Sequence, residues 1–478
     1  MFQSRKNLIL LAISLFLIGL LIRLPLLQLN GTDDHPVFKL WSYVAATQPT
    51  SKIYRLLHDQ SVPLSIQNIK GVLNFEVVPA MWKYNTWKSG IDYPPIIPII
   101  LGGIGHLYFA VSANFADSNL LNALVKIPSL LADAAVTLLI FRLVEQRYGL
   151  RMAVLCSNIF WLNPMTIITG PLFAYQDPLY AAPLIISILL FSYGHYVFGW
   201  MGFAITILTK PQGLVIGPAL LVFTLARRDL ALLVKSLAIA AFVVLLFLLP
   251  FFLGGTFINL FANNLINGNE PFISGQNCNG WWIATYLLEV MQRSDGTDLW
   301  TALQLQPQIN WDDNALKVIH LPRARKLSII FYFAYISVVL GKWWWMHGRA
   351  KADPQSSQAT SIHEAAALIL YGQSMVLTQA HENHGFGPAA LILATWWLEK
   401  KNGREDRELL TIGLVLSAIV ALNIFTFYGF GPDIQMPAAH NFFWLDFSIV
   451  LSIANILTFI WWISRWLRTA KQASISTL

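Results

Sequence analysis

Long apolar runs separated by short charged loops dominate this chain. Each run is about 20 residues long, the length that an α-helix needs to cross roughly 30 Å of hydrocarbon. The alternating pattern of about ten residues per strand that is typical of outer-membrane barrels is missing. The pattern therefore predicts an all-α polytopic membrane protein with about 12 transmembrane helices.

Basic residues at the ends of the runs indicate their direction. Arg5 and Lys6 precede the first run, and Lys or Arg follows the runs that point inward, as the positive-inside rule requires. Both termini are therefore expected in the cytoplasm. The first run ends at Arg23-Leu24-Pro25 rather than at a small-residue cleavage site, so we expect it to be retained as a span. Full spans are expected at about 7–29, 121–144, 152–171, 178–198, 232–253, 327–346, 361–380, 386–398, 408–428 and 444–464.

Two apolar segments depart from this regular pattern. Segment 94–110 begins with two prolines and contains three glycines, so we expect a helix that lies in the membrane interface or dips part way into it. Segment 199–226 is interrupted at Lys210-Pro211-Gln212-Gly213 and is expected to form two short helices that meet on the outer side. A lysine at the bilayer centre would cost roughly 2.5–3.5 kcal/mol, whereas a break that lines a protected cavity is tolerated.

The composition agrees with a membrane protein. Of the 478 residues 56% are hydrophobic and 12% charged, and a soluble domain carries about twice that charge. The formal net charge of +7 comes from Lys and Arg in short loops, so topology explains it better than nucleic-acid binding does. Cys156 and Cys278 imply no disulfide framework. We expect one membrane domain, 1–478, with extracytoplasmic segments at 30–120, which includes interfacial helices, and at 254–325.

Polar residues from six separated stretches fall on the outer face in this topology. Ionisable side chains at membrane depth are costly and usually functional, so we expect these stretches to form one site. The stretches are Asp33-Asp34, Asp92-Tyr93, Gln176-Asp177, Lys210 to Gln212, Asn277 to Trp282 and His381-Glu382.

Such a site could transfer a sugar from a lipid-linked donor. A carboxylate can take the proton of an acceptor hydroxyl as that hydroxyl attacks the anomeric carbon. The leaving polyprenyl phosphate is already anionic, so a nearby lysine or imidazole would stabilise its charge. His381, Glu382 and His384 lack the His-Glu-x-x-His spacing of a zinc site, and no metal is expected.

Each candidate also has a structural interpretation. Asp33 and Asp34 could cap the helix that begins just after them, since Asp is favoured at that position; one aspartate could also serve each role. Asp92 could be a turn residue before the following prolines. Lys210 could extend to the interface without a ligand, although the Pro-Gln that follows favours a polar cavity.

An ordered set of short motifs resembles a known family. The motifs are Gly31 with Asp34, Phe38 and Trp41; Asp92-Tyr93-Pro94-Pro95; Lys126 to Asp133; Asn163-Pro164 followed by Gln176-Asp177; Lys210-Pro211-Gln212; and His381-Glu382. Over about residues 23–390 the chain is similar to membrane glycosyltransferases of the GT-C superfold. Within that group it resembles the glycosylphosphatidylinositol mannosyltransferase II-like proteins and the endoplasmic-reticulum glucosyltransferases that finish the N-glycan precursor.

This resemblance implies a GT-C-like fold and a role for each candidate. Asp34 aligns with the catalytic base, with its neighbour Asp33 as a substitute. Lys210 and His381 align with residues near the donor phosphate, and Lys126, where an arginine is common, is a third phosphate candidate. The residues expected to shape the sugar and acceptor pocket are Asp92, Tyr93, Gln176, Asp177, Gln212 and Glu382. The family type generally needs no metal or other cofactor, because the lipid-phosphate sugar is the donor substrate.

We therefore expect a hexosyltransferase that moves mannose or glucose from a polyprenyl- or dolichyl-phosphate sugar to a hydroxyl of a lipid or glycan acceptor, with inversion. The site would face the extracytoplasmic or lumenal side of a bacterial inner membrane or of the endoplasmic reticulum. The alternative is a secondary transporter or lipid flippase whose substrate site lies at the break in 199–226. A non-catalytic scaffold subunit on the same fold is a third possibility.

Overall fold

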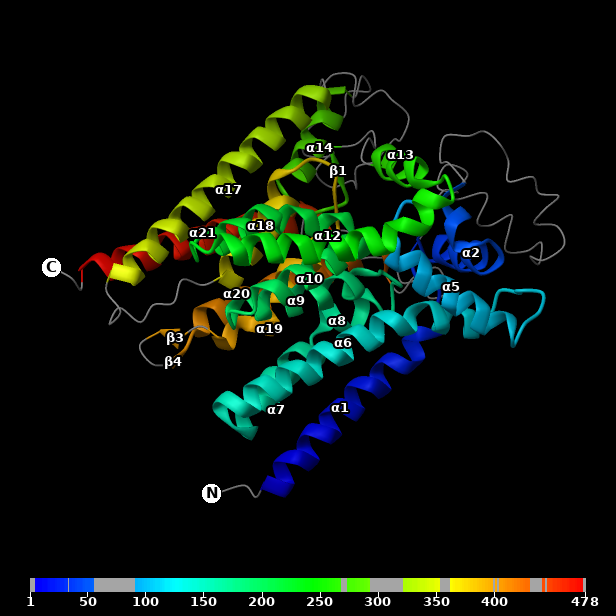
Figure 1. Ribbon diagram of the computed structural model, residues 1–478, viewed down its shortest axis with the longest axis horizontal. Coiled ribbons are helices and arrows are strands. Elements are labelled where there is room, and N and C mark those ends of the chain that lie inside the picture. Colours follow the sequence, from blue (N-terminus) through cyan, green and yellow to red (C-terminus); the bar gives the residue numbers. More distant parts are fainter. Residues whose placement is uncertain are drawn as a thin grey trace.

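The computed structural model describes residues 5–32, 34–55, 91–267, 273–292, 321–352, 362–398, 400–401, 404–429, 441–442 and 445–475. Within these ranges the chain forms a bundle of helices, accompanied by six strands of two residues each (Figure 1). The all-α class predicted from the apolar runs is confirmed.

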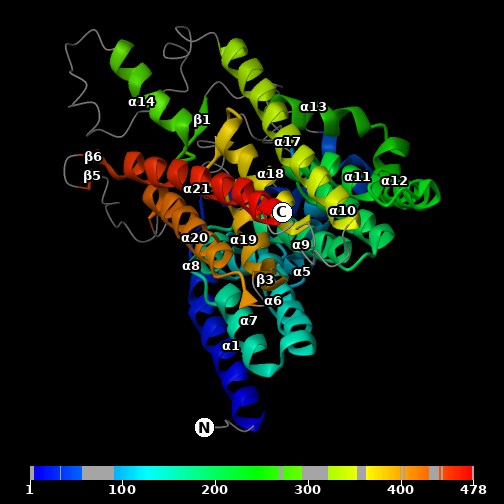
Figure 2. The ribbon, with the colours of Figure 1, turned by 90° about the vertical axis from the view of Figure 1, so that its left-hand side faces the viewer.

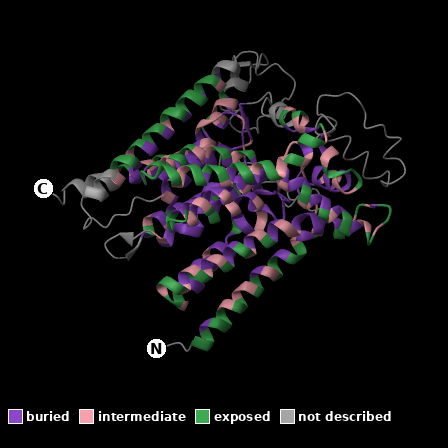
Figure 3. Cartoon of the chain, in the orientation of Figure 1, coloured by how far each residue is buried: buried purple, intermediate pink, exposed green. Residues whose placement is uncertain are grey.

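Six helices in the described part of the chain are long and apolar enough to cross a membrane. Their outer faces carry exposed apolar side chains (Figure 3), and Leu21, Leu245 and Phe331 are each more than half exposed. So much exposed apolar surface is stable against lipid rather than water, as expected of a multi-pass membrane protein. The six helices are α1 (Arg5–Leu27), α6 (Asn119–Tyr148), α12 (Leu230–Leu253), α17 (Leu321–Ala352), α20 (Arg407–Tyr428) and α21 (Phe447–Ile475).

The other expected spans correspond to shorter helices. At 1.5 Å per residue, the 14 residues of α5 (Ile96–Phe109) cover about 21 Å, less than the hydrocarbon thickness. This length suits the interfacial helix predicted there. The further short helices are α7 (Leu150–Trp161), α8 (Pro164–Thr169), α9 (Asp177–Ser192), α10 (Tyr196–Thr209), α11 (Gly217–Leu225), α18 (Ile362–Val376), α19 (Phe386–Thr395) and the 3-10 helix η3 (Trp396–Leu398). A total of 12 crossings stays a prediction.

Helix α19 lies at the centre of the bundle. All of its residues are buried, and it packs against α9, α18 and α20. The long helices α1 and α17 lie at the periphery in Figure 1, and the turned view shows α12 at the edge of the bundle as well (Figure 2). Short helices therefore form the apolar interior of the bundle, and the long helices lie between this interior and the lipid.

The helical segment 199–226 is interrupted at Lys210, as the sequence predicts. Helix α10 ends at Thr209, and the 3-10 helix η2 (Pro211–Ile216) follows. Lys210 has an extended backbone, with φ −149° and ψ 131°, because the residue before a proline is disfavoured in the helical conformation and Pro211 has no N–H to continue the ladder. The Lys210 side chain consequently lies at the junction between two helices, and it is buried.

Helices α2 (Asp34–Thr47) and α5 pack against each other beside the 3-10 helix η1 (Thr50–Arg55). A Cβ at Gly105 would lie 2.1 Å from the Ser42 carbonyl oxygen, so only glycine permits this close approach. Phe38, Trp41 and Tyr54 contribute to a second apolar core between these elements. In Figure 1, α2, α5 and α13 (Phe257–Asn267) lie together at the right.

Basic junctions gather at the other end of the bundle. The α6–α7 junction, the hairpin of β3 (Lys400–Lys401) and β4 (Arg404–Glu405), the first turn of α1 and the last turn of α21 lie toward the left of Figure 1. The positive-inside rule would place such basic junctions in the cytoplasm.

Residues 273–279 form a short strap that joins two distant parts of the chain. Strand β1 (Ser274–Gly275) pairs in parallel with β2 (Ala380–His381), and α14 (Gly280–Gln292) continues from it (Figure 2). The side chains of Asn277 and Asn279 donate to the Ser374 carbonyl at 2.6 and 2.8 Å. The predicted polar stretch that begins at Asn277 thus anchors this strap to α18.

Candidate active site

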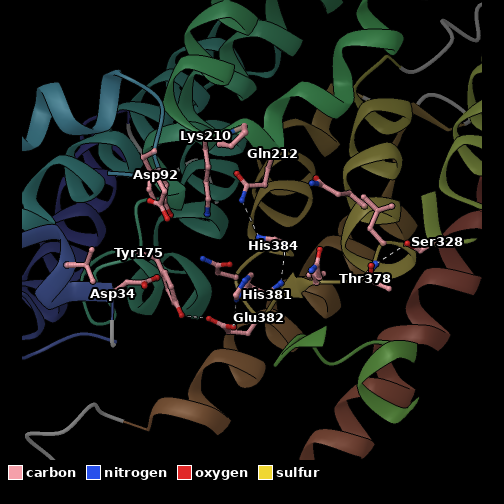
Figure 4. A pocket seen from close by; sticks show the side chains of 18 of the residues that line it. Asp34, Asp92, Tyr175, Lys210, Gln212, Ser328, Thr378, His381, Glu382 and His384 are labelled. Atoms are coloured by element: carbon pink, nitrogen blue, oxygen red, sulfur yellow. Dashed lines mark hydrogen bonds and ion pairs between the residues drawn. The ribbon is translucent and has the colours of Figure 1, made fainter. Parts of the chain in front are cut away.

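A cavity of about 380 Å³ lies where α2, η2 and the loop after α18 meet (Figure 4). Its walls also include Asp92 and Tyr93 before α5, Tyr175 before α9, and the first turns of α17. The predicted site residues that line it are Asp34, Asp92, Tyr93, Lys210, Gln212, His381 and Glu382. Four of the six predicted stretches therefore contribute to one cavity, whereas Gln176-Asp177 and Asn277 to Trp282 do not line it, and Asp33 lies outside the described residues.

Asp34 supplies a carboxylate to the cavity wall from the first turn of α2. A carboxylate there is stabilised by the positive end of the helix dipole, so the structural interpretation also has support. Burial raises the pKa of the Tyr93 hydroxyl well above its usual range, and the charge of Asp34 raises it further. Tyr93 therefore stays protonated and can donate a hydrogen bond beside Asp34.

Lys210 and Asp177 form a buried ion pair. The Lys210 ammonium donates to Asp177 Oδ1 at 2.9 Å, and the two side chains are 3% and 1% exposed. Asp177 does not line the cavity, and its other oxygen accepts from Asn383 Nδ2 at 3.0 Å. Asp177 therefore positions Lys210 and Asn383, both of which line the cavity, rather than forming part of its surface.

Two other predicted residues also lie behind the wall. Gln176 donates to the Ala174 carbonyl at 2.9 Å and does not line the cavity. The Lys126 ammonium donates to the carbonyls of Leu26, Leu29 and Leu172 at 3.1, 2.7 and 2.8 Å. The predicted phosphate contact of Lys126 is therefore corrected: its ammonium fastens the end of α1 to the loop before α9.

Glu382 follows β2 in a tight turn. Its N–H donates to the Gly275 carbonyl at 3.2 Å, and its carboxylate accepts a hydrogen bond from the Tyr175 hydroxyl. Burial raises the pKa of Glu382, although the neighbouring His381 and the bond from Tyr175 offset part of this effect. The strap and the turn thus fix the backbone at Glu382, and His381, which is about one third exposed, faces the same cavity.

Several lining residues escape the sequence analysis. Arg325 and Ser328 come from the first turns of α17, Tyr175 precedes α9, and Asn383 and His384 follow Glu382. A usable signal exists only for Arg325. It stands at the outer end of a predicted span, where the positive-inside rule disfavours a cation, and such an exception points to an anionic ligand.

No group of three His, Cys, Asp or Glu side chains suited to a metal ion occurs within the described ranges. The polar groups of the cavity are instead three carboxylates, cations from Lys210 and Arg325, and histidines and amides. Asp34 and Asp92 lie on one side of the cavity, and Glu382 lies beside His381 (Figure 4). The chain matches no family model, and comparison with curated proteins finds no match.

Proposed function

We propose that this protein is a membrane glycosyltransferase of the GT-C type that moves a hexose from a polyprenyl-phosphate sugar to an acceptor hydroxyl. The observation that carries the proposal is that Asp34, Lys210 and His381 line one cavity of about 380 Å³. A base and two phosphate-binding groups are the minimum that the reaction requires, and the volume is in the range of small-molecule sites.

The reaction assigns a role to each wall of the cavity. Asp34 takes the proton of the acceptor hydroxyl while the oxygen forms a bond to the anomeric carbon. The bond from that carbon to the phosphate oxygen breaks, and its electron pair leaves with the polyprenyl phosphate. A single displacement of this kind inverts the anomeric configuration.

We assign Lys210, Arg325 and His381 the role of stabilising the phosphate as it leaves, because all three line the cavity. Arg325 is an additional candidate for the phosphate beside Lys210. We assign it the place that was first given to Lys126.

The end of the bundle that carries the cavity is proposed to face outward or into the lumen. The basic junctions, the first turn of α1 and the last turn of α21 gather at the opposite end, toward the left of Figure 1, and the positive-inside rule places such loops in the cytoplasm. The short helices would complete a total of about 12 membrane segments.

The test is transfer by the full chain in lipid vesicles, with radiolabelled polyprenyl-phosphate mannose or glucose as donor and a membrane lipid extract as acceptor. Asp34→Asn should lower the transfer rate about 10²- to 10⁴-fold, the usual contribution of a general base. Asp229→Asn is the matched control, because Asp229 caps α12 through the backbone N–H of Leu232 at 2.9 Å and asparagine also caps well. Full transfer by both Asp34→Asn and Asp33→Asn would refute the proposal.

A transporter or lipid flippase is the second candidate, and the break at Lys210 favours it. Discontinuous helices at polar cavities are typical of secondary transporters. The same vesicles separate the two: flux of lipid or solute without transfer of label from the donor would support the transporter.

A further inference from the structure

Among the side chains of the cavity wall, those of Trp41, Gln212 and Asn383 each carry a buried polar atom with no hydrogen-bond partner in the described part of the chain. These atoms are Trp41 Nε1, Gln212 Oε1 and Asn383 Oδ1. Trp41 and Asn383 are only 2% and 5% exposed. Buried polar atoms are nearly always paired, because an unmade hydrogen bond is costly, so atoms of this kind around one cavity point to a ligand that completes them.

The amide of Gln212 can be oriented from its neighbours. The backbone N–H of His381 donates to His384 Nδ1 at 3.2 Å, so a neutral His384 carries its proton on Nε2. His384 Nε2 lies 3.2 Å from the Gln212 amide (Figure 4) and must meet the oxygen of that amide. The oxygen and nitrogen of a glutamine amide are assigned from their hydrogen bonds. Exchanging them in Gln212 places its NH₂ group, rather than its oxygen, at the position without a partner in the described structure.

The three groups surround the Lys210 ion pair. The Trp41 ring lies 5.5 Å from the Tyr93 ring, and the Lys210 ammonium lies 5.8 Å from the same Tyr93 ring. On its other side Lys210 contacts Asp177, which holds Asn383. Phe38 completes an aromatic trio, with ring centroids 5.5 Å from Trp41 and 5.9 Å from Tyr93.

This set of groups suits hydroxyls better than phosphate. Trp41 and Gln212 donate, whereas Asn383 Oδ1 accepts, and a phosphate dianion offers nothing to an acceptor. A hydroxyl both donates and accepts, and the aromatic trio gives the C–H faces of a pyranose an apolar surface. Because the three atoms are covered, small rotations of the side chains must turn them toward the ligand.

We propose that Trp41, Gln212 and Asn383 bind the hydroxyl groups of the donor hexose and so distinguish a glycosylated lipid phosphate from a bare one. This inference rests on the proposed function, and it names which wall of the cavity holds the sugar. Lys210 then lies where the sugar meets the phosphate, and the phosphate extends toward Arg325 and His381.

The test compares binding of polyprenyl-phosphate mannose, polyprenyl-phosphate glucose and bare polyprenyl phosphate to the full chain in nanodiscs. Trp41→Phe keeps an aromatic ring but removes the N–H, and should weaken binding of at least one sugar-bearing lipid about two- to tenfold, the effect of one hydrogen bond. Binding of the bare lipid should not change. Gln212→Met should show the same selectivity and serves if Trp41→Phe fails to fold.

Trp396→Phe is the matched control. Trp396 is also 2% exposed with an Nε1 that lacks a partner among the described residues, but it does not line the cavity. Its replacement should leave all three affinities unchanged. Unchanged binding by Trp41→Phe and Gln212→Met, or an equal loss for lipids with and without sugar, would overturn the inference while leaving transfer by the wild type, and thus the proposed function, intact. Failure of wild-type transfer would instead overturn the proposed function.

Discussion

Two buried groups of charges lie in different parts of the bundle, and they are built differently. The Arg465 group has most of its charges paired: the guanidinium bonds to Glu364 and Asp406. Its Nε lies 3.9 Å from Glu408 and has no hydrogen-bond partner among the described residues. Trp462 donates to Glu364 as well, at 3.0 Å. None of these residues lines the cavity.

The Lys210 group borders open space. Its ion pair with Asp177 is accompanied by Gln212 and Asn383, which keep polar atoms unpaired within the described structure. Burial of charge therefore does not by itself indicate a site. Charges that pair with one another away from this cavity fix the helices, whereas charges that line the cavity are available to a ligand.

The largest expected effect is on stability, at the Arg465 group. Arg465→Met leaves Glu364 and Asp406 buried without their cation, and should lower the free energy of unfolding by about 3–5 kcal/mol. Thermal unfolding in detergent measures it. Arg468→Met is the control, because Arg468 is 65% exposed in its pair with Glu408 and should cost at most about 1 kcal/mol. An equal loss of unfolding free energy in Arg465→Met and Arg468→Met would contradict a structural role for the Arg465 group.

The next effect is on transfer, at the cavity. Lys210→Met combined with Asp177→Asn removes both charges, so no unpaired charge is left buried and the protein should stay folded. Transfer should fall about 10²- to 10³-fold, as when one group that stabilises a leaving oxyanion is removed. Lys126→Met is the control, because the Lys126 ammonium donates to three backbone carbonyls and does not line the cavity. Its transfer rate per folded molecule should stay close to that of wild type. A double variant with wild-type transfer would show that Lys210 is structural as well.

The smallest effect is a pH slope at Glu382. Burial raises its pKa above the ordinary 4.5, so the folded protein keeps this proton to a higher pH than the unfolded chain does. Stability is therefore lost as pH rises between the two pKa values, by at most about 1.4 kcal/mol per pH unit.

Glu382→Gln should remove that part of the slope while His381 and Tyr175 remain. The melting temperature of wild type minus that of the variant, followed upward from about pH 4.5, should decrease. An increase would mean that the carboxylate is stabilised in its charged form.

The sequence predicts the helical class, the interruption at Lys210 and seven of the residues that line the cavity. Polar residues beside proline, or at the ends of apolar runs, stand out because lipid leaves them few places to lie. That argument identifies Asp34 and Lys210 correctly as cavity residues. It cannot distinguish Lys210, which lines the cavity, from Lys126, which does not. The carbonyls that accept hydrogen bonds from Lys126 come together only when α1 packs against the loop before α9.

The remaining site residues depend on tertiary contacts. Asn383 becomes a candidate, and Trp41 gains a role beyond its place in the first motif, because each has a buried polar atom without a hydrogen-bond partner in the described structure, which no local pattern encodes. The charge pattern singles out Arg325, at the outer end of a predicted span. The Arg465 group shows the opposite case. Its buried ionisable residues would be expected at a functional site from sequence reasoning, but they join three helices and do not line the cavity.

The cavity wall begins at Asp34 and is completed only at His384. A nascent chain therefore carries the aspartate through most of its synthesis before the opposite wall leaves the ribosome. On this architecture the cavity is complete only after the loop that follows α18 has been synthesised, late in translation.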